Sequence, residues 1–275
     1  MSTQHKQQPG PVAIVTGATT GIGAATAGAL RAAGYQVFGT YRKPPATRVP
    51  GVDYVACDVT DDLAVAAAVR EVLAKAGRID LLVNNAGVGL TGAAEESSLE
   101  QAKSIFDVNV FGVIRMTKAV LPLMRRQRSG RIVNISSVLG LIPSPFSALY
   151  ASSKHAIEGY SESLDHEVRT SGIRVVLVEP AYTRTGFDSN ALVADQQHEH
   201  YGAARAHAEA MLRAVMTTAD PPDVVAEAVL TAATAATPRL RYTAGRLAMR
   251  ASLLRRFVPA SAFDKSLRKQ LQMPA

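Results

Sequence analysis

Short β-branched runs alternate along the chain with longer stretches rich in Ala and Leu, and this alternation restricts the fold more than any other feature. The strand-like runs are Val12–Thr16, Gln36–Thr40, Asp53–Ala56, Asp80–Val83, Arg131–Ile135 and Arg174–Val178. Helix-like stretches lie near residues 22–33, 61–76, 98–127 and 151–170. Several runs are almost wholly apolar, as is typical of strands covered on both faces. The pattern predicts a single doubly wound α/β domain with a parallel sheet.

The alternation ends near residue 185, and the remaining residues are predicted to complete and cover this domain. Residues 186–220 have an Ala-rich helical pattern and are expected to form a lid over the open end of the sheet. A helix at Pro221–Ala236 and a last strand at Leu240–Thr243 follow. The predicted domain spans residues 11–245, between a flexible N-terminus at 1–10 and a basic helical tail at 246–275.

The net charge of +7 belongs to the C-terminal part of the chain. From Arg239 onwards there are nine basic residues and one acid, whereas the first 238 residues hold 21 basic and 22 acidic residues. A nearly neutral body argues against a nucleic-acid-binding protein. The tail segment Arg246–Val258 is basic and amphipathic. This is typical of a docked helix with a solvated basic face, and also of weak contact with a membrane surface.

Three absences in the sequence predict a soluble cytoplasmic protein. The single cysteine, Cys57, excludes a disulfide within the chain and fits a reducing compartment. The first ten residues are polar and lack the apolar stretch of a signal peptide. No apolar run approaches the ~18 residues of a membrane-spanning helix.

A glycine-rich turn joins the first strand to the first helix, and it reads Thr16-Gly17-Ala18-Thr19-Thr20-Gly21-Ile22-Gly23. Glycines here allow a close approach of the backbone to a pyrophosphate, and the helix N-terminus offers free N–H groups. We expect a dinucleotide to be bound by Gly17, Thr19, Thr20, Gly21 and Ile22. The spacing GxxxGxG differs from the common GxGxxG fingerprint, so an ordinary Gly-rich turn is the alternative.

The end of the second strand indicates which dinucleotide binds. A site for NAD places an acid there to bind the ribose 2′-hydroxyl. Here the strand is followed by Tyr41-Arg42-Lys43, and no Asp or Glu occurs between residues 24 and 52. A guanidinium fits the oxygens of a 2′-phosphate well, so Arg42 favours NADP(H) as the cofactor. Solvated loop charges are the alternative.

Polar residues also follow the third and fourth strands. Asp58-Val59 comes after the third strand, where a carboxylate can accept a hydrogen bond from an adenine amino group. Asn84-Asn85-Ala86-Gly87 ends the fourth strand, and we expect cofactor contacts from Asn84, Ala86 and Gly87. A helix cap at Asp58 and a simple turn at the Asn pair are the alternatives. Their common position at strand ends favours the ligand site of an open α/β sheet.

A phenol and an ammonium lie four residues apart in Tyr150-Ala151-Ser152-Ser153-Lys154, and therefore on one helix face. A nearby cation favours the phenolate and is expected to lower the pKa of the tyrosine toward the range of acid–base catalysis. Ser136 and Ser137 follow the fifth strand and supply hydroxyls that can hydrogen-bond a substrate oxygen.

In the order of these motifs the chain resembles the short-chain dehydrogenase/reductase family, of the type with about 250 residues. The similarity runs from residue 11 to 185 and includes TGATTGIG (16–23), Asp58, NNAG (84–87), Asn109, Ser137, Tyr150, Lys154 and Pro180–Thr185. The resemblance implies a Rossmann-type sheet of about seven strands with helices on both faces. It also implies hydride transfer between a nicotinamide and an alcohol or carbonyl group.

The resemblance assigns a role to each matching residue. Tyr150 is the acid/base at the substrate oxygen, Lys154 lowers its pKa and binds the nicotinamide ribose, and Ser137 rather than Ser136 holds the substrate oxygen. Asn109 anchors a water of a proton relay. Thr183 and Thr185 lie near the nicotinamide carboxamide, and Pro180 is also expected to contact the cofactor. Two positions depart from the family: Ala181 replaces a glycine, and Thr20 replaces the basic residue of some NADP-preferring members.

Two further expectations come from the resemblance. The family forms homodimers or homotetramers, here through the helices at 98–127 and 151–170. A non-catalytic NADP-binding regulator on the same fold is the alternative function. Such regulators can lose the tyrosine or the lysine, and both are present in this chain.

The expected substrate pocket is mostly apolar, which favours a lipophilic alcohol, ketone or aldehyde over a sugar or an acid. Its residues come from Leu90, 138–147 and 182–187, and include Leu139, Leu141, Ile142, Phe146, Tyr182 and Phe187. The sequence around Tyr150 is similar to the hydroxysteroid and retinol dehydrogenase-like branch. We predict no metal site, since His198, Glu199 and His200 lack further ligands at suitable spacing.

Overall fold

Seven parallel strands form the central sheet, in the order β3-β2-β1-β4-β6-β7-β9. Their bounds are Val12–Val15 (β1), Gln36–Tyr41 (β2), Val52–Ala56 (β3), Leu81–Asn84 (β4), Gly130–Ile135 (β6), Ile173–Pro180 (β7) and Arg241–Ala244 (β9). The computed structural model describes residues 10–44 and 46–270. It confirms the predicted fold class and strands. The expected flexible segment lies outside the described residues except for Gly10.

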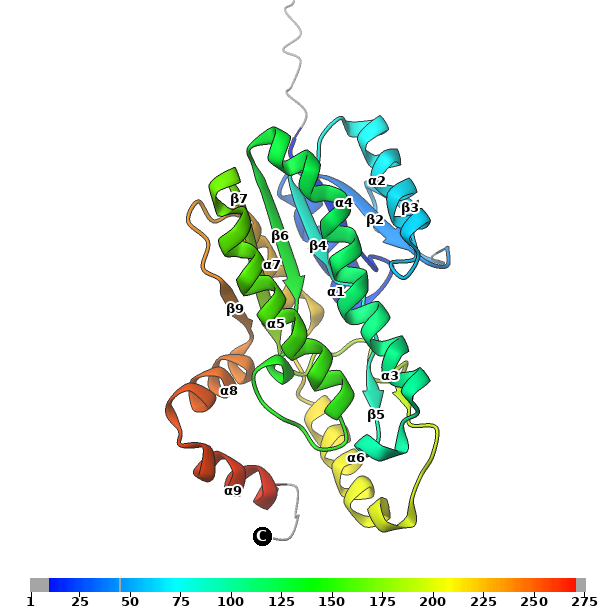
Figure 1. Ribbon diagram of the computed structural model, residues 1–275, viewed down its shortest axis with the longest axis vertical. Coiled ribbons are helices and arrows are strands. Elements are labelled where there is room, and N and C mark those ends of the chain that lie inside the picture. Colours follow the sequence, from blue (N-terminus) through cyan, green and yellow to red (C-terminus); the bar gives the residue numbers. More distant parts are fainter. Residues whose placement is uncertain (1–9, 45, 271–275) are drawn as a thin grey trace, which may run out of the picture.

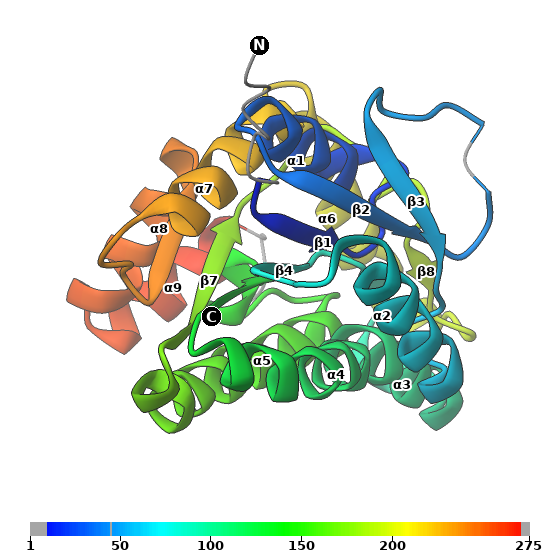
Figure 2. The same cartoon turned by 90° about the horizontal axis from the view of Figure 1, so that it is seen from above.

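Alternate residues of each strand enter two separate cores, because successive side chains point to opposite faces of a sheet. Val12 and Ile14 of β1 pack in one core, and Ala13 and Val15 pack in the other. The first core is closed by α2 (Asp62–Ala76), α4 (Gly112–Gln127) and α5 (Ala148–Val168). The second is closed by α1 (Gly21–Ala32) and α7 (Pro222–Thr234). Figure 2 shows these two helical layers on either side of the sheet.

The order of the strands reverses between β1 and β4. The chain runs from β1 outward through β2 to β3, then returns to place β4 on the other side of β1. In open α/β sheets ligands bind at the carboxyl ends of the strands beside such a reversal. The loops after β1 and β4 are the glycine-rich turn and the Asn84–Gly87 segment, so the topology brings the two predicted cofactor motifs together.

The helix expected at 98–127 is interrupted. The structure has α3 (Leu99–Phe106), a π-helical turn at Asp107–Phe111 and then α4. A π-turn inserts one extra residue into a helix and is often found at functional sites. Here it carries Asn109, which is 1% exposed.

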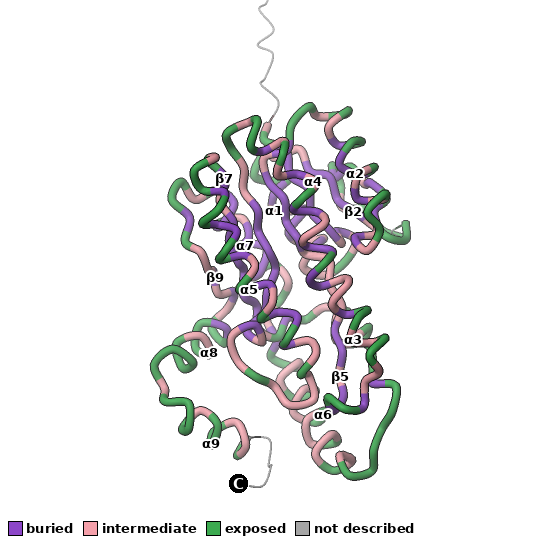
Figure 3. The backbone as a smooth tube through the Cα atoms, viewed as in Figure 1, coloured by how far each residue is buried: buried purple, intermediate pink, exposed green. Residues whose placement is uncertain are grey.

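The remaining elements lie beyond the carboxyl ends of the strands (Figure 1). They are a two-stranded sheet of β5 (Leu90–Thr91) and β8 (Leu192–Val193), and the helices α6 (Gly202–Met216), α8 (Arg246–Phe257) and α9 (Ala260–Gln270). Figure 3 shows buried strands in the body and mostly exposed residues along α8 and α9. Within the described ranges, no helix is both long and apolar enough to cross a membrane.

Candidate active site

The turn after β1 forms a cradle of backbone at the N-terminus of α1. Gly17 has φ +62°, in the left-handed region that favours glycine. A Cβ on Gly23 would lie 2.2 Å from the carbonyl oxygen of Gly17, so no side chain fits there. The N-cap residue Thr20 is extended and makes no side-chain capping bond. The first N–H groups of α1 are therefore available to an anionic ligand, as expected for a pyrophosphate site.

Thr16 and Asn85 tie this turn to the loop after β4. The Thr16 Oγ1 accepts hydrogen bonds from the backbone N–H groups of Asn85 and Ala86, both at 2.9 Å. The Asn85 Nδ2 donates to the carbonyls of Thr16 and Gly17 at 2.9 and 3.1 Å. Neither residue was assigned a role from the sequence. Only their position inside the two predicted cofactor motifs could have indicated this role.

The predicted 2′-phosphate residue, Arg42, is exposed just beyond β2. It forms no hydrogen bond or ion pair with another side chain in the described ranges, which leaves its guanidinium open to a ligand. Asp58 accepts hydrogen bonds from Thr60 N and Oγ1 at 2.9 and 2.7 Å. Burial raises the pKa of Asp58, but the Thr60 bonds and the charges of Arg42 and Arg115 outweigh it and lower the pKa below its ordinary value. Asp58 is therefore ionised at neutral pH.

The side chains of Asn84 and Val59 face the protein interior. Asn84 Nδ2 donates to Asn134 Oδ1 at 2.8 Å, and Asn134 Nδ2 donates to Ser161 Oγ at 2.8 Å. Val59 packs against the backbone of Gly112 and is 8% exposed. The Asn84 side chain therefore takes part in hydrogen bonds within the body, and the Val59 side chain packs against α4. The cofactor contacts expected of Asn84 and Val59 stay predictions.

The segment after β7 closes over the glycine-rich turn. A Cβ on Gly21 would lie 3.2 Å from the side chain of Thr185. Pro180 ends β7 and is buried, and Thr183 is 8% exposed. Gly21 and Thr185, predicted from distant parts of the sequence to bind the cofactor, thus lie side by side.

The predicted catalytic residues meet at the start of α5. Lys154 Nζ donates to the carbonyl of Ile135 at 2.8 Å and lies 5.7 Å from the centroid of the Tyr150 ring. Ser137, directly after β6, adjoins the Tyr150 hydroxyl closely enough to lower the pKa of the phenol. Ser137 is 8% exposed and Lys154 is 7% exposed.

The electrostatics of Tyr150 differ from the sequence-based expectation. Burial raises the pKa of the phenol above its ordinary value of 10, the neighbouring Ser137 hydroxyl lowers it, and the Asp188 carboxylate raises it further. The net direction is upward, whereas the sequence suggested a lowered pKa for Tyr150. Burial also lowers the pKa of Lys154 to about 8, although Glu158 acts in the opposite direction. At neutral pH Tyr150 carries its proton and Lys154 is mostly cationic.

Asn109 holds the loop after β4 against this group. Its Oδ1 accepts from Val88 N, and its Nδ2 donates to Val88 O, both at 2.9 Å. The Nδ2 also donates to Ser153 Oγ at 3.1 Å. A Cβ on Gly87 would lie 3.2 Å from Asn109 Oδ1 and 4.0 Å from Lys154 Nζ. Gly87 is therefore positioned by Asn109 beside the lysine, and the expected water relay stays a prediction.

Residues 11–197 match the family described as short chain dehydrogenase. The chain belongs to the short-chain dehydrogenase/reductase family. A 3-ketodihydrosphingosine reductase of Bacteroides thetaiotaomicron is 42% identical over 192 residues, which are 69% of this chain and 71% of that protein. The bovine dehydrogenase/reductase SDR family member 7B is 38% identical over 67% of this chain and 61% of that protein, in keeping with the branch indicated by the sequence.

Two solved structures match almost the whole chain. A short-chain dehydrogenase from Streptomyces avermitilis is 32% identical with a TM-score of 0.78, covering 97% of this chain and 96% of that one. A family member from Burkholderia phymatum in complex with NAD is 27% identical with a TM-score of 0.76, covering 96% of each chain. This chain is therefore an oxidoreductase-family protein whose backbone cradle fits a nicotinamide dinucleotide.

In this short-chain dehydrogenase/reductase, the start of residues 186–220 lies beside the predicted catalytic residues. The Phe187 ring is 5.8 Å from the Tyr150 ring, and Tyr201 meets Phe146 edge-on at 6.3 Å. Glu96, 1% exposed, accepts from His198 N at 2.7 Å and forms an ion pair with Arg205. The sequence did not indicate the role of Glu96, because its partners are about a hundred residues away.

Two buried acids lie close to each other, and one of them, Glu158, acts electrostatically on the predicted catalytic residue Lys154. Glu158 is 5% exposed and Glu179 is 0% exposed. Arg241 bridges them, with its Nε 3.0 Å from Glu158 and 3.3 Å from Glu179, and also pairs with Glu162 at 3.0 Å. Burial and the neighbouring Glu158 raise the pKa of Glu179 to about 7, although Arg241 acts in the opposite direction.

Replacing Glu179 by glutamine is expected to stabilise the protein at high pH. An acid whose pKa rises on folding binds its proton more tightly in the native state, so the native state loses stability as pH rises from 4.5 through about 7. Above that range, ionisation of Glu179 lowers the free energy of unfolding by a few kcal/mol, on the order of 1.4 kcal/mol per pKa unit. Thermal unfolding should show a higher Tm for Glu179→Gln at pH 8 and a shrinking difference toward pH 5.

The matched control is Glu162→Gln, which removes a half-exposed partner of the same arginine. We expect its effect to stay within about 1 kcal/mol, as for most surface ion pairs. A Glu179→Gln protein less stable than the natural one at pH 8 would show that the carboxylate is required by Arg241.

Proposed function

We propose that the protein is an NADP(H)-dependent oxidoreductase that transfers a hydride between the nicotinamide and a lipophilic secondary alcohol, ketone or aldehyde. The observation that carries the proposal is the close grouping of Ser137, Tyr150 and Lys154, with the lysine Nζ 5.7 Å from the centroid of the tyrosine ring. This group stands at the carboxyl ends of the strands, next to the glycine cradle. A non-catalytic regulator would not need the three groups together.

The chain's own residues would act on the substrate oxygen. The nicotinamide, when bound, supplies or accepts the hydride. Ser137 would donate a hydrogen bond that polarises the carbonyl, and Tyr150 would give its proton to the oxygen as negative charge develops there. The raised pKa of Tyr150 keeps the phenol protonated and suits this step. The Lys154 ammonium would stabilise the resulting phenolate.

The direct test follows NADPH absorbance in the presence of lipophilic ketones. The similarity to a 3-ketodihydrosphingosine reductase makes long-chain 3-keto lipids the first choice. The apolar lining expected from Leu139, Leu141 and Phe187 supports the same class. Cofactor binding without turnover of any ketone, aldehyde or alcohol would favour the regulator instead.

Replacing Arg42 by alanine is expected to raise KM for NADPH by about tenfold or more. A charge-assisted hydrogen bond to phosphate contributes ~1.5–3 kcal/mol to binding. NADH has no 2′-phosphate, so it makes no such bond that the substitution could remove. KM for NADH should therefore change little. Steady-state kinetics with both cofactors measure the split, with Lys43→Ala as the control for loss of a neighbouring exposed cation. Equal weakening of both cofactors by Arg42→Ala would contradict the assignment.

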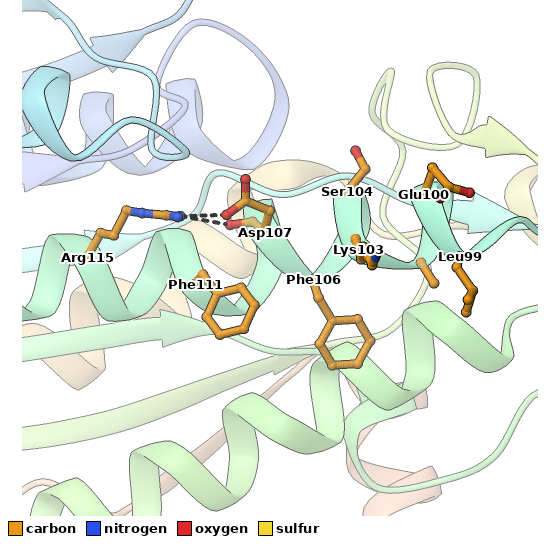
Figure 4. A pocket seen from close by; sticks show the side chains of 9 residues that line it. Leu99, Glu100, Lys103, Ser104, Phe106, Asp107, Phe111 and Arg115 are labelled. Carbon is orange, nitrogen blue, oxygen red and sulfur yellow. Dashed lines mark hydrogen bonds and ion pairs between the residues drawn. The ribbon is translucent and has the colours of Figure 1, made fainter.

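We further propose that residues 186–220 act as a lid and that the protein self-associates through its long helices. A groove of about 860 Å³ follows the outer face of α3 and α4, lined by Leu99, Phe106 and Phe111 among others (Figure 4). Phe111 is 51% exposed there, and Leu99 is 72% exposed. A second subunit would cover these side chains. A monomer in sedimentation velocity would contradict self-association. The predicted cytoplasmic location stays a prediction.

A further inference from the structure

The outer face of α8 exposes large apolar side chains. Its members are Leu247, Met249, Leu253, Leu254 and Phe257, from 47% to 71% exposed. They are five of the eleven exposed large hydrophobic residues in the described ranges, gathered on a helix of 12 residues. Isolated exposed leucines are ordinary, but a contiguous group of this kind marks a surface that meets another apolar phase.

The opposite face of α8 is already packed against the body. Ala248 is 0% exposed, and Arg255 Nε donates to the carbonyl of Leu141 at 3.2 Å. At 3.6 residues per turn, Met249, Leu253 and Phe257 lie on the side away from these two contacts. The helix cannot turn to bury the apolar side chains without losing its contacts with the body.

Cations alternate with the apolar side chains on this outer face. Arg246, Arg250 and Arg256 are exposed between them, and α9 adds the exposed Lys265 and Lys269. Residues 246–270 contain seven basic residues and one acid, a net charge of +6. A second copy docked on this face would bring like charges together. An anionic lipid surface instead pairs each guanidinium with a phosphate while the apolar side chains enter the acyl boundary.

The face lies at the end of the molecule that carries the predicted substrate loop. Leu141, the partner of Arg255, follows Ser137 by four residues in the loop expected to line the substrate pocket. Figure 1 shows α8 and α9 beyond the carboxyl ends of the strands, at the same end as the start of α5. Attachment through α8 would therefore hold the substrate loop at the lipid surface.

We propose that the outer face of α8 docks on an anionic bilayer and presents the substrate opening to lipid molecules in it. The inference that the opening receives lipids rests on the proposed function. The docking itself rests only on the exposed apolar and basic residues of α8 and α9.

Co-sedimentation of the full-length chain with vesicles tests the docking. The vesicles contain phosphatidylcholine alone, or phosphatidylcholine and phosphatidylglycerol in equal shares. We expect binding to the anionic vesicles, and a loss of about tenfold or more in Arg246→Glu/Arg250→Glu, because each basic residue contributes ~1 kcal/mol near an anionic surface. Leu253→Glu/Phe257→Glu should lose a similar factor. Leu63→Glu, at an 80% exposed leucine of α2, should bind as the natural chain does.

Three results would overturn the docking: equal binding to neutral and anionic vesicles, equal loss in Leu63→Glu, or no binding by the natural chain. Light scattering completes the test. If the natural chain does not bind vesicles but forms a dimer that the α8 variants dissociate, the face is a contact with a second copy. Turnover of a water-soluble ketone should be unchanged in the α8 variants. Vesicle binding by a chain that turns over no substrate would reject the proposed function and retain the docking.

Discussion

Replacing Tyr150 by phenylalanine is expected to lower kcat by ~10²–10⁴-fold, the usual contribution of a positioned general acid. The hydroxyl removed is the one that adjoins Ser137. The ring itself is retained, so its packing against Phe187 at 5.8 Å should persist. Steady-state turnover with NADPH and a ketone that the natural enzyme reduces gives the measurement.

Two observations separate loss of chemistry from loss of structure. Tyr150→Phe should bind NADPH with nearly unchanged affinity and unfold at nearly the same temperature. Tyr182→Phe removes the hydroxyl of a tyrosine that is 40% exposed in the neighbouring segment, and it should retain most of the turnover. Normal turnover by Tyr150→Phe would reject the assigned acid.

Replacing Gly23 by alanine is expected to disrupt cofactor binding and weaken the fold. The added Cβ would lie 2.2 Å from the Gly17 carbonyl oxygen and 2.5 Å from Asn85 Nδ2, distances that no methyl group tolerates. Relief requires the turn to separate from the loop after β4, which breaks the bonds that Asn85 makes. We expect a loss of ~1–3 kcal/mol of stability, the cost of overpacking. Affinity for NADPH should fall by about tenfold or more, because the phosphate cradle is displaced.

Gly28→Ala is the matched control on the same helix. A Cβ there meets only Val49 Cγ1, at 3.7 Å, which is an ordinary contact. Alanine in a helix interior is favoured over glycine by ~0.5–1 kcal/mol, so this variant should be slightly stabilised and bind NADPH normally. Thermal unfolding and fluorescence titration of both variants make the comparison. Equal cofactor affinity in the two would remove the argument for a rigid cradle.

Much of the fold was predictable because it depends on local pattern. The apolar runs from Val12, Gln36 and Arg174 are strands because their side chains enter cores on both faces. The two cofactor motifs follow β1 and β4, and the parallel topology alone brings their loops together. The spacing of Tyr150 and Lys154 likewise fixes them on one face of α5.

The unpredicted features depend on contacts between distant residues. The π-turn at Asp107–Phe111 has the composition of the surrounding helix, so no periodicity separates it from α3 and α4. The pairing of Leu90–Thr91 with Leu192–Val193 joins segments about a hundred residues apart and is too short to leave a pattern. The upward direction of the Tyr150 pKa depends on burial, and burial by Phe187 and its neighbours is known only once the chain is folded.

The attachment of the proposed lid, residues 186–220, at Glu96 has a consequence for how the sequence can diverge in evolution. Glu96 binds His198 and Arg205, and both residues come before most of α6 in the chain. None of the three predicted acid–base groups lies in the rest of α6, residues 206–216. Substitutions in this stretch can therefore accumulate while Glu96, its two partners and the predicted reacting groups stay unchanged.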